Sequence, residues 1–253
     1  MAVTVLFSGG VDSLCVARWA QARFSDVHGV YYCVGQKYAA RESSQATELA
    51  KKIHLPFNIQ AALILREDPV TARVELRNLF FIELAGLGSD AVCYGELLAE
   101  EPTDKRPVFR RRLQTLLRSQ RETPFHIYAP FAKYTKSQMI REYIRQYGTE
   151  FLTDSVACFD ADGACGACMS CFNRWLAWEE NNLSLESYRV HPAQAMLERL
   201  QTMHRNKGAR DWNAVSLGRV WARRRWLIEC RRQLNRYCYR QHGVSAWRYA
   251  HAS

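Results

Sequence analysis

The stretch AVTVLFSGGVDS, residues 2–13, decides the fold. Its first half is an apolar run rich in β-branched residues, which predicts a buried β-strand that ends at Ser8. Gly9 and Gly10 allow a tight turn, and apolar residues at helical spacing then predict a helix that runs to about Phe24. Such a turn exposes free backbone N–H groups at the helix N-terminus, which is a favourable place for a phosphate group. It is not a Walker motif, because no lysine follows the glycines.

Three polar side chains of this turn could take part in chemistry on a bound phosphate. Ser8 and Ser13 offer hydroxyl groups, and Asp12 could orient Mg²⁺ or a leaving pyrophosphate. A structural interpretation competes with this one: the glycines only turn the chain, while Asp12 and Ser13 cap the helix that follows. The residue types by themselves leave both interpretations open.

The first 150 residues continue as strands that alternate with helices. Apolar runs predict further strands at residues 27–34, 57–65, 90–94 and 126–128, and helical spacing predicts helices at residues 41–53, 74–88, 108–118 and 135–147. This alternation is typical of right-handed βαβ units. We therefore predict an α/β fold built on a parallel sheet.

A cluster of cysteines follows the α/β region. Its members are spaced C-x6-C-x2-C-x2-C, with two glycines between them: Cys158, Cys165, Cys168 and Cys171. Four thiolates so close together can surround one tetrahedral zinc ion, and four protein ligands leave no open position, so the predicted zinc is structural. An iron–sulfur cluster and a redox-active dithiol are the competing interpretations. The other five cysteines lack such a spacing, and we expect them to be small buried apolar residues.

The positive charge is concentrated near the end of the chain. The 253 residues carry a formal charge of +10, and residues 183–253 hold 14 Lys and Arg against 4 acidic residues. The first 182 residues are therefore neutral overall. From Ser216 the sequence predicts a basic amphipathic helix, with Val220, Leu227, Leu234, Cys238, Trp221, Ile228 and Tyr237 toward its apolar side. Such a helix could pack on the body or on a second subunit, or its arginines could bind an acidic protein or a nucleic acid.

The sequence also indicates where the protein works. No apolar run approaches 18 residues, so we expect no membrane span. The stretch MAVTVLFSGG lacks the basic and apolar regions of a signal peptide, and nine cysteines in such a chain favour thiols or metal ligands over disulfides. We therefore expect a cytoplasmic protein.

The S-G-G-x-D-S pattern after the first strand resembles the PP-loop of the ATP pyrophosphatases. This resemblance implies a five-stranded parallel sheet with helices on both faces. It also implies that a substrate oxygen attacks the α-phosphate of ATP, giving an adenylate and pyrophosphate. The ATP-binding residues implied by the loop are Ser8, Gly9, Gly10, Val11, Asp12 and Ser13.

Together, the loop and the cysteine cluster resemble the 7-cyano-7-deazaguanine synthase family over about residues 1–180. Further segments that resemble family motifs in order are Tyr32–Tyr38 with Glu42 and Ala46, Arg77–Phe81, Gly95 with Asp104–Phe109, Pro130–Phe131 with Thr135–Lys136, and Cys158–Arg174. The chain departs from the family pattern at Tyr38, where the family usually has His, and at Lys105, where it has Cys. The segment before Arg77 is also shorter than in the family.

This second resemblance implies a substrate and a set of roles. The family adenylates the carboxylate of 7-carboxy-7-deazaguanine, captures it with ammonia as an amide, then activates the amide again and dehydrates it to the nitrile. The cofactors implied are ATP, Mg²⁺ and a structural Zn²⁺. The candidate catalytic residues are Asp12, Ser13 and Lys136, and Lys136 would lie near the ATP phosphates. The candidate substrate-binding residues are Gln36, Lys37, Glu42, Arg77, Asn78, Gly95, Asp104 and Arg106.

We expect the chain to have three regions, and we expect the protein to form a homodimer. Residues 1–150 would form the ATP-binding domain, residues 151–182 a zinc-binding segment packed on it, and residues 183–253 a basic helical extension. Two alternative functions remain. Relatives in antiphage defence suggest an enzyme that joins a 7-deazaguanine to a protein amine, and the basic extension suggests a PP-loop protein that modifies or binds tRNA.

Overall fold

The computed structural model describes residues 1–61, 76–98, 103–155, 158–160, 162–184, 187–207, 220–246 and 249. The chain divides into two compact units, Met1–Tyr134 with Glu142–Val156, and Thr135–Arg141 with Ala157–Ser253. Within the described residues, no helix is both long and apolar enough to cross a membrane.

A five-stranded parallel sheet forms the centre of the first unit. Its strands are β1 (Ala2–Leu6), β2 (Asp26–Cys33), β3 (Phe57–Ala61), β4 (Ala91–Cys93) and β5 (His126–Tyr128). They lie in the order β3-β2-β1-β4-β5, and every neighbouring pair is parallel. The predicted parallel sheet is therefore confirmed. Of the predicted strand at residues 57–65, residues 62–65 lie outside the described part of the chain.

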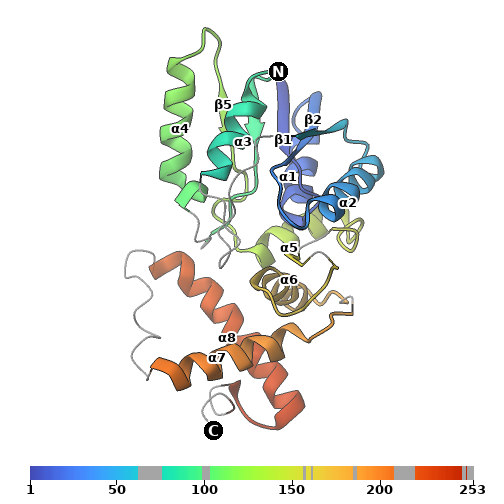
Figure 1. Cartoon of the computed structure of the whole chain (residues 1–253), viewed down its shortest axis with the longest axis vertical. Helices are drawn as coiled ribbons and strands as arrows, with labels where there is room; N and C mark the ends of the chain where they lie inside the picture. The colour runs from blue at the N-terminus through green and yellow to red at the C-terminus, as the bar shows by residue number, and fades with distance from the viewer. Residues whose placement is uncertain are drawn as a thin grey trace. The chain divides into compact units, whose positions relative to one another are not determined.

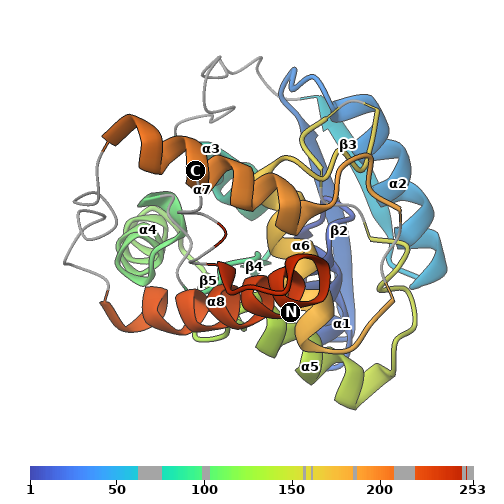
Figure 2. The ribbon, with the colours of Figure 1, turned by 90° about the horizontal axis from the view of Figure 1, so that it is seen from below.

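Helices cover both faces of this sheet, as expected (Figures 1 and 2). Helices α1 (Val11–Gln21) and α2 (Ala39–Lys52) lie on one face, and α3 (Arg77–Gly86) and α4 (Pro107–Ser119) lie on the other. This division follows from the strand order, because right-handed crossovers that run in opposite directions from β1 place their helices on opposite faces. A short 3₁₀ helix, η1 (Thr103–Lys105), precedes α4, and α5 (Lys136–Tyr147) follows β5.

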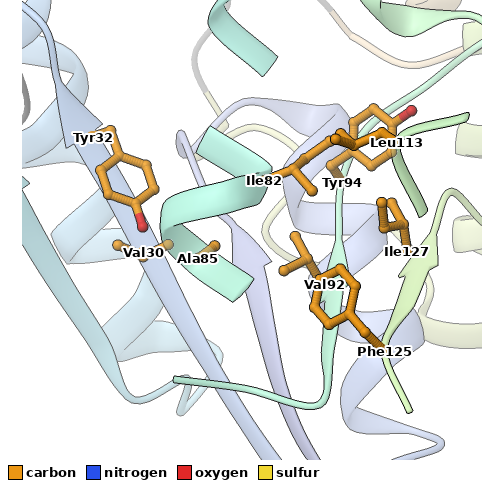
Figure 3. Close-up of a cluster of buried hydrophobic side chains, with 9 residues drawn as sticks. All are labelled: Val30, Tyr32, Ile82, Ala85, Val92, Tyr94, Leu113, Phe125 and Ile127. Atoms are coloured by element: carbon orange, nitrogen blue, oxygen red, sulfur yellow. The ribbon is translucent and has the colours of Figure 1, made fainter. Parts of the chain in front are cut away.

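The face under α3 and α4 carries a continuous apolar core (Figure 3). Strand side chains at alternate positions, such as Val30 and Tyr32 of β2, point to this face because successive side chains of a strand alternate. They pack against Ile82 and Ala85 of α3 and Leu113 of α4. The remaining members of the cluster are Val92, Tyr94, Phe125 and Ile127. This packing fixes where the carboxyl ends of the strands lie.

The second unit is helical, with α6 (Met169–Glu180), α7 (Pro192–Lys207) and α8 (Val220–His242) packed on one another. Their shared core consists of Phe172, Trp175, Leu176, Ala193, Leu197, Cys230, Leu234 and Cys238. The predicted apolar side of the basic helix is correct at Leu234 and Cys238 but wrong at Ile228, which is 55% exposed. Cys230 takes part in the core instead, because α6 and α7 approach α8 from that side. The side chains of Val220, Trp221 and Leu227 lie outside the described part.

Candidate active site and metal centre

The turn at residues 8–13 lies where a ligand site is expected in this topology. The strand order reverses direction between β1 and β4, and open α/β sheets bind ligands at the carboxyl ends of the strands at such a point. The loop leaves β1 beside β2, since the amide of Phe7 donates to the carbonyl oxygen of Val30 at 2.9 Å. It then enters α1 at Val11. Strand, turn and helix are therefore arranged as the sequence predicts.

Gly9 is required by the shape of this turn. Its φ of +72° is in the left-handed region, which disfavours residues with a side chain. A Cβ atom on Gly9 would also lie 2.8 Å from Cα of Ala46, a fully buried residue of α2. The close approach of α2 thus requires a residue without a side chain at position 9.

The N-terminus of α1 has the features of an anion site. Its N-cap is Gly10, which has an extended conformation and no side chain with which to cap the helix. The hydroxyl of Ser13 donates to the carbonyl oxygen of Gly10 at 2.9 Å, and the hydroxyl oxygens of Ser8 and Ser13 lie 3.5 Å apart. Gly10, rather than Asp12 or Ser13, therefore occupies the N-cap position of α1. The first-turn N–H groups keep their partial positive charge for a bound anion.

Gly95, which follows β4, packs against this helix start. A Cβ atom on Gly95 would lie 3.3 Å from Cβ of Asp12. Asp12, which follows β1, and Gly95, which follows β4, are thus brought together. A side chain at position 95 would push against the loop.

The loop after β2 contributes a second group of polar side chains. The hydroxyl of Tyr31 donates to Oε2 of Glu42 at 2.8 Å, and Nε2 of Gln36 donates to the Tyr31 oxygen at 2.5 Å. The amide of Val34 in turn donates to Oε1 of Gln36 at 2.9 Å, which fixes the orientation of that side chain. Burial and the Glu42 carboxylate raise the pKa of Tyr31, so the phenol remains a donor. Gln36 and Glu42 are thus held together, whereas Lys37 is exposed.

The start of α3 carries three more of the predicted residues. Arg77 is the first residue of α3 and lies within electrostatic range of Glu42. Burial raises the pKa of Glu42, while the Tyr31 hydrogen bond and the charge of Arg77 oppose this rise. Oδ2 of Asp104 accepts from both the backbone amide and Nδ2 of Asn78, at 3.1 and 3.0 Å. Because both side chains are buried and bonded to each other, their geometry supports a role in holding the start of α3.

The sequence analysis missed an ion pair next to Gly95. Glu96 is only 1% exposed, and its Oε2 accepts from the hydroxyl of Tyr94 at 2.6 Å and from Nε of Arg110 at 3.1 Å. Within the described residues, its Oε1 has no hydrogen-bond partner. A carboxylate two residues beyond a buried strand was the available signal, but its partner lies 14 positions away on α4.

Arg106 is the N-cap residue of α4 and borders a cavity of about 380 Å³. Its Nε is buried and has no hydrogen-bond partner in the part of the chain that the structure describes. The cavity is otherwise lined by Leu79, Val108, Phe109, Arg112, Leu113 and Leu116. The remaining predicted residue, Lys136, is the first residue of α5 and belongs to the second unit.

The four cysteines of the second unit come together in a cluster that could hold a metal ion. Their sulfur atoms all lie within 4.8 Å of one another. Sγ of Cys158 and Cys165 are 3.5 Å apart, and Sγ of Cys165 and Cys171 are 3.9 Å apart. Sulfur atoms about 2.3 Å from a tetrahedral zinc ion would be about 3.8 Å apart, so the spacing fits zinc. Hydrogen bonding from Cys171 lowers the pKa of Cys168, which favours the thiolate.

The backbone around the cysteines is held by the segment that follows α6. The amides of Arg189 and Val190 donate to the carbonyl oxygens of Ala164 and Cys165, at 3.0 and 3.2 Å. Gly166 has a φ of +78°, and a Cβ atom there would lie 1.6 Å from the carbonyl oxygen of Val190. The glycine between the cysteines is therefore required by close packing as well as by the turn.

The topology, the loop after β1 and the cysteine cluster define the class: an α/β protein with a five-stranded parallel sheet, a glycine-rich loop after its first strand and four clustered cysteines that could hold a metal ion. Comparison with known proteins narrows this class. The family model described as "Queuosine biosynthesis protein QueC" matches residues 2–67 and 58–182. The chain therefore belongs to the QueC family, and residues 183–253 lie outside the match.

Individual relatives agree with this assignment. A 7-cyano-7-deazaguanine synthase from Marinobacter nauticus is 26% identical over 211 residues, which cover 72% of this chain and 94% of the relative. The enzyme of the same name from Pseudoalteromonas translucida is 25% identical over a region that covers 72% of this chain and 95% of the relative. That from Lysinibacillus sphaericus is 29% identical, covering 66% and 89%. A U34-tRNA thiolase from Methanococcus maripaludis has a TM-score of only 0.40 at 13% identity, covering 87% and 80%, and supports no inference.

Proposed function

We propose that this protein is an ATP-dependent carbon–nitrogen ligase that converts 7-carboxy-7-deazaguanine into 7-cyano-7-deazaguanine. Membership of the QueC family and the 7-cyano-7-deazaguanine synthases among its relatives support this substrate. One structural observation carries the ATP half of the proposal: a helix N-terminus with glycine at its N-cap follows a left-handed glycine at the point where the strand order reverses.

The proposed reaction begins with activation of the substrate carboxylate. A carboxylate oxygen attacks the α-phosphorus of ATP, and the bond to the β-phosphate oxygen breaks, giving an acyl adenylate and pyrophosphate. Ammonia then attacks the acyl carbon, AMP leaves, and the amide results. A second ATP activates the amide oxygen, and loss of that oxygen with AMP and of two protons gives the nitrile. Without activation, a carboxylate is a poor acyl donor.

Each part of the site has a proposed task in these steps. The amides at the start of α1 and the Lys136 ammonium group would offset negative charge on the phosphates as pyrophosphate departs. Asp12 and Ser13 lie in the first turn of α1, where Asp12 would help to hold Mg²⁺. Bound Mg²⁺ would share the neutralisation of the phosphate oxygens. Each of these side chains thus acts on the leaving group.

The substrate would be held by residues after β2 and at the starts of α3 and α4. Arg106, whose Nε has no hydrogen-bond partner among the described residues, would bind the substrate carboxylate, and Arg77 and Lys37 would add positive charge. Gln36 and Glu42 would hydrogen bond to the deazaguanine, and Asn78 with Asp104 would hold Arg77 in place. The four cysteines would bind a structural zinc ion, because they occupy all four coordination positions.

The proposal is tested by incubating zinc-loaded protein with ATP, Mg²⁺, ammonium and 7-carboxy-7-deazaguanine. We expect AMP and pyrophosphate to form, with the nitrile detected by mass spectrometry. No AMP from protein that is folded and zinc-loaded would refute the ligase function. AMP formed with a deazaguanine-sized mass added to a protein would instead identify a protein amine as the acceptor.

A further inference from the structure

The basic extension holds the beginning of α5 through one half-buried carboxylate. Glu229 of α8 accepts hydrogen bonds from the hydroxyl of Thr135 at 2.9 Å and from the hydroxyl of Ser137 at 3.0 Å. Thr135 is 1% exposed and Ser137 is 2% exposed, so both donors are buried while Glu229 itself is half-buried. The residue between them is Lys136, the proposed phosphate-binding lysine.

Further hydrogen bonds, both within α5 and to the residue that follows α6, hold the start of α5 in place. Thr135 and Gln138 form a capping box: the Gln138 amide donates to Oγ1 of Thr135 at 3.3 Å, and the Thr135 amide donates to Oε1 of Gln138 at 3.0 Å. The carbonyl oxygen of Ser137 accepts from Nδ2 of Asn181, which follows α6, at 3.0 Å. Because the Thr135 hydroxyl both caps the helix and donates to Glu229, the carboxylate also orients the cap.

Helix α8 is itself held in register on α6. Glu180 at the end of α6 accepts from Nε of Arg232 at 2.9 Å and from Nε2 of Gln233 at 2.8 Å. On the same stretch of α8, Cys230 and Leu234 are buried in the core shared with α6. Because α8 is held on α6 by these contacts, the backbone position of Glu229 is fixed by the packing of the two helices.

We propose that the extension, through Glu229, positions Lys136 for its work on the ATP phosphates. This inference rests on the proposed function, and it assigns a role to residues that lie outside the family match, which ends at residue 182. Glu229 is a positioning residue that acts through Lys136.

The test compares Glu229→Gln with the wild-type chain in the ATP-dependent reaction. A glutamine offers one acceptor oxygen instead of two, so one hydroxyl loses its bond. We expect kcat/KM for ATP to fall at least tenfold, with KM for 7-carboxy-7-deazaguanine changed less than twofold and zinc content unchanged. Glu229→Asp, which keeps both acceptor oxygens, should recover part of the loss. Glu198→Gln, an exposed residue of α7, is the matched control and should match wild type.

A double variant separates positioning from general support of the fold. If Glu229 acts through Lys136, Lys136→Ala/Glu229→Gln should be no slower than Lys136→Ala alone. Additive losses in the double variant, or wild-type kcat/KM in Glu229→Gln, would overturn the inference. If Glu229→Gln does not fold, Ser137→Ala removes one of the two bonds and should give a smaller loss of kcat/KM in the same direction.

Hydrogen exchange keeps this test separate from the test of the proposed function. Amides of residues 137–141 should exchange at least tenfold faster in Glu229→Gln than in wild type, and unchanged exchange would contradict the inference. This readout needs no substrate. If wild-type protein forms no AMP but amide exchange is faster in Glu229→Gln, the proposed ligase function is refuted. The conclusion that Glu229 anchors α5 is then still supported.

Discussion

Replacement of Gly9 by alanine tests the geometry of the proposed ATP loop. The left-handed backbone at this position costs a residue with a side chain about 1–2 kcal/mol. Forcing a methyl group against a packed backbone adds about 1–3 kcal/mol, and here the new Cβ would lie 2.8 Å from Cα of Ala46. Gly9→Ala should therefore destabilise the first unit by about 2–5 kcal/mol.

A matched glycine isolates the two contributions. Gly148 has a φ of +70°, but no atom lies within 4 Å of a Cβ added there. Gly148→Ala should therefore lower the free energy of unfolding by only about 1–2 kcal/mol. Exchange of the slowest β1 and β2 amides reports the free energy of unfolding of the first unit. Gly9→Ala should also lose ATP turnover under conditions in which it remains folded. Equal destabilisation by the two substitutions, with turnover kept, would refute the idea that α2 and the loop require glycine.

Three further substitutions probe the metal centre and the buried polar groups. Cys168→Ser should lose zinc and much of its solubility, measured by metal analysis, since three thiolates and a hydroxyl bind zinc poorly. Arg110→Met should lower the free energy of unfolding by about 3–5 kcal/mol, because it leaves the Glu96 carboxylate buried without its cation. Asp104→Ala should lower the free energy of unfolding by about 1–3 kcal/mol, because two donors of Asn78 lose their acceptor.

Each of these expectations has a clear contrary result. A stable and active Cys168→Ser protein without metal would contradict the structural zinc. In Arg110→Met, adding Glu96→Gln should recover part of the lost stability, and no recovery would show that the ion pair is not the cause. Wild-type stability of Asp104→Ala in a urea titration would remove its assigned role at the start of α3.

Local patterns in the sequence were sufficient for the α/β fold. The strand that ends at Ser8, the two glycines and the helix that begins at Val11 follow from neighbouring residues, whose backbone preferences act over a few positions. The cysteine spacing likewise brings four sulfur atoms together because the ligands lie within one short segment. These features are confirmed by the structure.

Contacts between distant segments could not be predicted in the same way. Glu229 lies 94 positions from Thr135, and no periodicity in the sequence links a residue of α8 to the start of α5. The exposed Ile228 shows a related limit, because helical spacing identifies an apolar side but not which neighbours will cover it. The pair formed by Glu96 and Arg110 was missed because each residue alone resembles a surface charge.

Transfer of oxygen from the substrate to AMP tests the central claim most directly. The protein is incubated with ATP, Mg²⁺, ammonium and 7-carboxy-7-deazaguanine that carries ¹⁸O in its carboxylate, and the AMP is analysed by mass spectrometry. If the carboxylate oxygen attacks the α-phosphorus, the AMP released in the first step contains one ¹⁸O atom from the substrate. Unlabelled AMP, or no AMP, would contradict adenylation of the carboxylate by this protein.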